Sequence, residues 1–305
     1  MNSASQCQPG GGIFRKLDKG VVKVMILSEI NIYPIKSLRG ISLQTAEIED
    51  RGLRNDRRWM LVDENDSFVT QRVLPKMALI DVAIDAHGLT VSCDGFGSQT
   101  IDLEPEGAVS RSVTVFSSTV PGEFYADAIN EWFSDVLGTR LRLVRMPASS
   151  RREVSEKYRL RNSDIVSFAD GYPFLLIGEA SLTDLNTQLA EPVEMKRFRP
   201  NFVVKGSEPY EEDRWKQFRI GANTFFGVKL KGRCVVTTID PATGTVAGKD
   251  PLLTLSKYRG GMLDGKRGAF FGQNLIAEAA AGTVSVGDSI EVDIYHDPPV
   301  EMVRK

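Results

Sequence analysis

The sequence predicts an α+β chain that is mostly β, and three observations support this prediction. Short runs of alternating or β-branched apolar residues recur in both halves, separated by Gly, Pro, Asn and Asp. Helical spacing of apolar residues is found in the segments 123–137 and 179–189. The 305 residues are 42% hydrophobic and 26% charged, as expected of a globular protein with one large domain or two ordinary ones.

The first half, residues 21–145, is expected to consist mainly of short strands. A polar loop at 63–66 joins residues 57–62 to 67–72, which predicts a β-hairpin. The helix at 123–137 interrupts this pattern, and its aromatic residues are expected to pack in a core. The other predicted extended segments are 23–33, 41–48, 78–84 and 89–93.

The second half, residues 162–296, again alternates strands with one helix. A buried strand is predicted at 174–177, another at 235–239, and a closing hairpin at 282–292 that turns at Gly287-Asp288. Residues 146–161 form a basic connection between the halves. The arginines and lysines of 140–161 are interpreted either as a solvated linker or as a docking strip for an acidic partner. Residues 1–20 are expected to be a disordered leader, and 297–305 a tail.

Composition excludes several classes of function. Lys and Arg number 38 and Asp and Glu 40, so the chain lacks the basic field of a nucleic-acid binder. Two histidines and three widely spaced cysteines exclude a disulfide framework and a four-cysteine iron–sulfur cluster. Neither a dinucleotide-binding glycine motif nor a serine nucleophile elbow is present. No apolar stretch reaches membrane-spanning length and no secretory signal is evident, which predicts a soluble protein.

Cys234 is the residue most clearly suited to a chemical role. It precedes the β-branched run 235–239, and Asp240-Pro241 with Gly244 then predict a turn. Arg233 beside it supplies a cation, which favours thiolate over thiol, and a thiolate is a metal ligand or a nucleophile. The alternative is a buried cysteine that only packs.

These residues also carry a resemblance. The segment 233–241 resembles the one that supplies the molybdenum-ligating cysteine in the MOSC family, and the amidoxime-reducing components in particular. Four further segments are similar to motifs of that family: 33–37, 52–59, 197–201 and 270–274. The resemblance implies an N-terminal MOSC-type β-barrel domain over 21–145 and a strand-rich MOSC domain over 162–296.

The resemblance also implies a site for the molybdenum cofactor, with Cys234 as the metal ligand and a catalytic residue. The chain departs from the family where a cofactor-contacting arginine would align with Asn55, so Arg57 is expected in that role with Arg54 as its substitute. Asn274 replaces an aromatic contact. Asp240 is interpreted as a proton source or, alternatively, as a cap of its turn. The remaining residues expected to bind the cofactor are Lys36, Ser37, Asp170, Gly171, Tyr172, Arg199 and Arg233.

The implied function is that of a molybdenum-dependent oxidoreductase. The family's reaction is the two-electron reduction of N-hydroxylated compounds, with a sulfur-free cofactor and no pyridoxal phosphate. Its electrons come from a b-type haem cytochrome supplied by an NADH-dependent flavoprotein, and a cytoplasmic or mitochondrial location is expected. One alternative is a cofactor carrier or sulfur-handling protein, since MOSC domains also occur in cofactor sulfurases. Another is a β-barrel binding module in which Cys234 merely packs.

Overall fold

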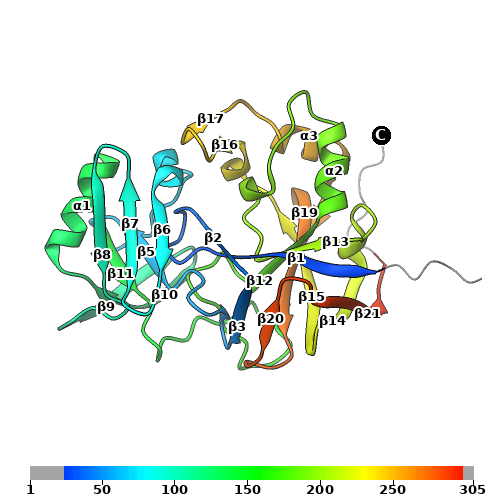
Figure 1. Ribbon diagram of the computed structural model, residues 1–305, viewed down its shortest axis with the longest axis horizontal. Helices are drawn as coiled ribbons and strands as arrows, with labels where there is room; N and C mark the ends of the chain where they lie inside the picture. The colour runs from blue at the N-terminus through cyan, green and yellow to red at the C-terminus, as the bar shows by residue number, and fades with distance from the viewer. Residues whose placement is uncertain (1–23, 298–305) are drawn as a thin grey trace, which may run out of the picture.

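The computed structural model describes residues 24–297, and within them it confirms a mostly β fold with three α-helices. The strands form a closed barrel and a smaller lobe beside it, with the helix α1 on the outer side of that lobe (Figure 1). The predicted leader 1–20, Cys7 and residues 298–305 of the predicted tail lie outside the described residues.

Seven strands close the barrel because β12 pairs with β13 on one side and with β19 on the other. The first strand of the chain lies in this ring, between β13 and β21, although the other six come from the second half. In ring order the strands are β12 (Phe174–Gly178), β13 (Phe202–Lys205), β1 (Met25–Ile32), β21 (Ser289–Tyr295), β14 (Trp215–Ile220), β15 (Asn223–Gly232) and β19 (Lys266–Ala277).

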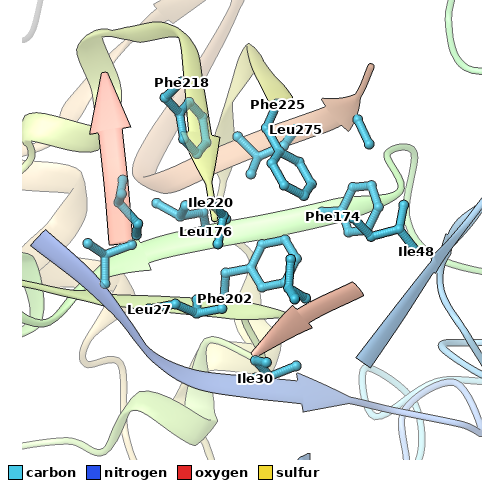
Figure 2. Packing of buried hydrophobic residues seen from close by; sticks show 14 of the residues in the cluster. Leu27, Ile30, Ile48, Phe174, Leu176, Phe202, Phe218, Ile220, Phe225 and Leu275 are labelled. Carbon is cyan, nitrogen blue, oxygen red and sulfur yellow. The ribbon is translucent and has the colours of Figure 1, made fainter. Parts of the chain in front are cut away.

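Aromatic side chains from different strands fill the barrel interior (Figure 2). The ring of Phe174 stacks on Phe202, with centroids 5.6 Å apart, and meets Phe225 edge-on at 5.5 Å. Phe202 and Phe225 are fully buried. Burial of such large apolar surfaces is the main stabilising contribution in a core of this kind.

The smaller lobe has two antiparallel sheets. One has the order β5 (Trp59–Val62), β11 (Arg142–Arg145), β10 (Ser118–Phe124) and β9 (Val109–Val115). The other has the order β6 (Asp81–Ile84), β7 (Leu89–Cys93) and β8 (Gly97–Ile101). The helix α1 (Asp127–Leu137) buries Phe133 and Leu137 against them. β3 (Thr45–Glu49) forms a separate small sheet with β4 (Gly52–Leu53) and β20 (Thr283–Ser285), whose Ile48, Leu53 and Val284 join the barrel core.

Several short elements complete the fold. β2 (Ile41–Leu43) pairs with β1, and β18 (Gly260–Leu263) pairs with β19. The other elements are the helices α2 (Glu179–Thr187) and α3 (Leu252–Tyr258), the 3₁₀ turns η1 (Pro75–Leu79), η2 (Met195–Arg197), η3 (Glu211–Arg214) and η4 (Val235–Thr238), and the short pair β16 (Ile239–Asp240) and β17 (Thr245–Val246).

The strand predicted at 235–239 is wrong, because four of its residues form η4. The hydroxyls of Thr237 and Thr238 donate to the carbonyls three residues earlier, at Cys234 and Val235. Such local bonds give the backbone an alternative to a sheet ladder. The turn predicted after it is present, and Gly244 adopts φ +62°.

The hairpin predicted at 282–292 is also wrong. The chain turns at Gly287 as expected, but β20 pairs with β3, whereas β21 pairs with β1 and β14. Other strand boundaries differ less: residues 67–72 form one antiparallel bridge, Phe68 to Val62, and residues 75–79 are a 3₁₀ turn. The helix predicted at 123–137 begins at Asp127, since Phe124 ends β10.

The predicted docking strip over 140–161 is not a free basic surface. Arg152 is buried, 6% exposed, and donates to the carbonyls of Ser167, Ala169 and Asp170. Most of its other cations are neutralised by acids of the same chain, and exposed pairs of this kind contribute little energy. These pairs are Arg140–Glu64, Arg142–Asp66, Arg145–Glu104, Arg145–Glu123, Lys157–Asp264, Arg159–Glu153, Arg159–Glu156 and Arg161–Asp164.

A buried carboxylate fastens α2 to the barrel. Glu212 is fully buried and accepts hydrogen bonds from the amide of Gly178 at 3.1 Å and the hydroxyl of Ser181 at 2.8 Å. Burial, and secondarily the charge of Asp213, raises the pKa of Glu212 to about 7. The folded protein therefore holds a proton that the unfolded chain loses near its ordinary pKa of 4.5.

This proton makes stability depend on pH. The contribution is complete below about pH 4.5 and is lost as the pH rises through about 7, so the free energy of unfolding should fall by on the order of 1–3 kcal/mol between pH 5 and 8. Urea unfolding at several pH values measures it. Glu212→Gln should flatten the dependence, whereas the exposed Glu131→Gln should leave it intact; an unchanged slope in Glu212→Gln contradicts this account.

Candidate functional site

A cavity of about 140 Å³ brings together residues from both halves of the chain. Its wall includes the turn after β1, the segment before β12, the residues around η2 and the end of β15. Within the described residues the wall carries seven cationic side chains and one carboxylate, that of Asp170. The cations are Lys36, Arg57, Arg72, Arg197, Arg199, Lys231 and Arg233.

Most of the residues predicted for the site line this cavity: Lys36, Ser37, Arg57, Asp170, Gly171, Tyr172, Arg199, Arg233, Cys234 and Asn274. Arg54 lies elsewhere, because its 56% exposed side chain pairs with Glu47 and Glu49. Asp240 also lies outside the lining. It accepts a hydrogen bond from the amide of Ala242 at 2.8 Å, as a turn cap does, and faces Arg197 at 3.5 Å.

Lys36, Asp170 and Lys231 form a charged chain along the wall. Lys36 donates to the carbonyl of Phe168 at 2.8 Å and to Asp170 at 3.0 Å, and Lys231 binds the other oxygen of Asp170 at 2.8 Å. Burial lowers the pKa of Lys36 to about 8, against the influence of Asp170. Burial alone would raise the pKa of Asp170, but the two lysines hold it well below its usual range.

Two guanidinium groups in the wall have an unused nitrogen. Within the described residues, Nη2 of Arg199 and Nη2 of Arg233 are buried and have no hydrogen-bond partner. Each group is fixed through its other nitrogens, Arg199 to the carbonyl of Leu38 and Arg233 to those of Phe198 and Phe271. Burial lowers the pKa of Arg199 to about 10 and that of Arg233 to about 9. An anion in the cavity would satisfy both donors.

Tyr33 holds two of these cations in place. The guanidinium carbons of Arg57 and Arg199 each lie 4.1 Å from the centre of its ring, and its hydroxyl donates to the carbonyl of Pro200. Asp56 binds Arg57 through both carboxylate oxygens and accepts from the amide of Tyr33. Tyr33 had no predicted role, although it begins one of the motifs that carry the family resemblance.

The backbone is strained at three lining positions. Ser37, Arg57 and Arg199 have φ of 70°, 50° and 56°, a region that residues with a side chain rarely adopt. Such positions cost on the order of 1–3 kcal/mol each and concentrate at functional sites. Gly272 adopts φ +81°, and a Cβ there would lie 2.7 Å from the carbonyl of Leu176 and 3.4 Å from Nη2 of Arg233.

Cys234 lies at the same cavity, and Arg72 is the cation in contact with it. Nη2 of Arg72 is 3.6 Å from the sulfur. Arg233, the neighbour in sequence, instead directs its guanidinium to backbone carbonyls. Nothing local in the sequence identified Arg72, because 162 positions separate it from Cys234.

The comparisons with known proteins agree with this architecture. A family model described as the MOSC N-terminal beta barrel domain matches residues 24–140, and one described as the MOSC domain matches residues 163–291. The chain belongs to the MOSC-domain family. It is 35% identical to mitochondrial amidoxime reducing component 2 of Rattus norvegicus over 78% of this chain and 73% of that one.

Two further relatives of this MOSC protein have informative names. Mitochondrial amidoxime-reducing component 1 of Homo sapiens is 32% identical over 88% of this chain and 83% of that one. Molybdenum cofactor sulfurase of Oryza sativa subsp. japonica is 32% identical over 76% of this chain but only 31% of its own length.

The residues of the cavity fit a molybdenum cofactor. The excess of cations and the unused guanidinium nitrogens suit an anionic, phosphate-bearing group. Among residues 24–297, no three His, Cys, Asp or Glu side chains gather as a metal site. A metal bound by Cys234 would therefore need ligands from a non-protein group, and a cofactor with its own sulfur ligands supplies them.

The pKa of Lys36 leads to a pH-dependent anion affinity. Sulfate, which stays dianionic, should bind the apoprotein about 2- to 4-fold more weakly at pH 8.5 than at pH 7, because Lys36 loses its proton near pH 8. Titration calorimetry measures the dissociation constants. Lys36→Met should bind weakly at both pH values, and the exposed Lys257→Met should behave as the wild type. The same pH dependence in Lys36→Met would refute the assignment.

Proposed function

We propose that this protein is a molybdenum cofactor-dependent reductase of N-hydroxylated compounds. The observation that carries the proposal is a single cysteine in a cation-lined cavity, in a chain whose relatives are named amidoxime-reducing components. In the reaction an amidoxime takes up two electrons and two protons, its N–O bond breaks, and an amidine and water are released. The sulfurase relative gives the carrier alternative weaker support, because this chain matches only 31% of that protein's length, compared with 73% and 83% for the two amidoxime-reducing components.

The protein's own residues would bind and orient the cofactor. Arg199 and Arg233 would donate their unused nitrogens, and Lys36, Ser37 and Arg57 would complete an anion site. Asp170, Gly171, Tyr172 and Asn274 offer further polar contacts along the wall.

Cys234 would ligate the metal, which when bound supplies the two-electron redox chemistry. Arg72 is placed to donate a hydrogen bond to the sulfur or to a substrate oxygen. Asp240 caps its turn and pairs with Arg197, so its contacts support the turn-cap alternative over the predicted role of proton source.

The electrons would come from a separate protein, a b-type haem cytochrome reduced by an NADH-dependent flavoprotein. No helix in the described part of the chain is long and apolar enough to cross a bilayer. Of the two predicted compartments, the names of the mitochondrial relatives favour the mitochondrion.

Metal analysis and turnover test the proposal together. Purified protein should contain about one molybdenum per chain and should reduce benzamidoxime with reduced viologen as the electron donor. Cys234→Ala should lose at least a hundredfold in turnover, because the metal loses its protein ligand. Cys93→Ala, a half-buried cysteine in β7, is the matched control and should keep both properties.

Different failures have different meanings. Molybdenum without turnover would support the carrier alternative. Protein that acquires no molybdenum when expressed with an adequate supply would support the binding module. Full turnover in Cys234→Ala would remove the site assignment.

A further inference from the structure

A phenylalanine is exposed at the tip of the β9–β10 hairpin. β9 and β10 pair up to Val115 and Ser118, so Phe116 and Ser117 form the two-residue turn. Phe116 is 38% exposed and has φ +54°. Two-residue hairpin turns with positive φ strongly favour Gly, Asn or Asp, and a bulky residue there is an outlier. Phe therefore does not stabilise the turn conformation itself, and a reason for Phe at this position must come from the contacts of its side chain.

The side chain of Phe116 contacts two residues that line the cavity, Lys36 and Arg72. Its ring is 4.7 Å from that of Phe68, in a tilted arrangement, and 5.1 Å from Nζ of Lys36. The guanidinium carbon of Arg72 lies 5.4 Å from the same ring, and Nη2 of Arg72 is 3.6 Å from the sulfur of Cys234. A continuous path therefore runs from the exposed ring through Arg72 to the thiol.

The charges along this path restrict what it can bind. Lys36 and Arg72 lie next to the ring, and the cavity beyond them has seven cations against one carboxylate within the described residues. A cationic ligand would be repelled, whereas an uncharged polar group can accept a hydrogen bond from Arg72. A flat conjugated group can stack on Phe116 and lie against the planar guanidinium.

We propose that Phe116, Phe68 and Arg72 form an aryl subsite at the mouth of the cavity, which selects flat, uncharged aryl N-hydroxylated compounds over aliphatic ones. This inference rests on the proposed reductase function. The aromatic part of the substrate lies on Phe116, and its N–OH group extends past Arg72 towards Cys234.

The test compares benzamidoxime with acetamidoxime, which carry the same reacting group on an aryl and a methyl substituent. Phe116→Gly should lower the ratio of their kcat/KM values 3- to 10-fold, mainly through a higher KM for benzamidoxime. Phe116→Tyr keeps the ring and should keep the ratio. Phe96→Ala removes a 47% exposed phenylalanine from the β7–β8 turn of the same lobe and should leave both values at the wild-type level.

Phe116→Gly is expected to fold, because glycine adopts positive φ without strain. A folded Phe116→Gly protein whose ratio stays within twofold of the wild type overturns the subsite. Equilibrium dialysis of benzamidoxime against the purified full-length protein, without reductant, keeps the two proposals apart. If the wild type reduces neither compound, the reductase proposal fails, while weaker binding by Phe116→Gly still supports the subsite and equal binding overturns it.

Discussion

The site depends on holding many like charges close together. Seven cationic side chains share one cavity wall with a single carboxylate among the described residues, and burial lowers the pKa of Lys36, Arg199 and Arg233. Repulsion between such groups opposes folding unless other interactions compensate. Here Asp170 bridges two lysines, Asp56 binds Arg57, and backbone carbonyls accept from the guanidinium groups. The cations that remain unpaired leave the cavity with a positive charge, and this charge gives the site its affinity for an anion.

The fold supplies the rigidity that this arrangement requires. The barrel has a closed hydrogen-bonded ring and an aromatic interior, so the strand ends that carry the site have little freedom. Strained turns at Ser37, Arg57 and Arg199 are tolerated because the surrounding packing determines them. Buried Arg152 adds a further constraint by binding three carbonyls of the segment that ends at Asp170. Through Arg152, the basic connection thus helps to fix the segment that carries Asp170.

Much of this could be predicted from local sequence. The strands at 23–33 and 174–177 could be predicted from short apolar segments, and the helix at 179–189 from its periodicity, because both signals belong to neighbouring residues. The run after Cys234 was misassigned because threonine hydroxyls bonded to the local backbone, which β-propensity does not reveal. The closing hairpin was misassigned because the turn was evident but the partners of its strands lie far away in the sequence.

The sequence by itself determined the strand-rich class, the family and most of the lining residues. These follow from short motifs and apolar patterns, which are properties of residues close together in the chain. The tertiary structure decided which cation meets the thiol, because Arg72 approaches Cys234 across 162 positions while adjacent Arg233 turns to backbone carbonyls. It also decided that Arg57 and not Arg54 lines the cavity. It placed the rings of Tyr33 and Phe116 against the cations Arg57 and Arg72. The physical reason is that side-chain direction and long-range packing depend on the closed sheet, which no local stretch of residues encodes.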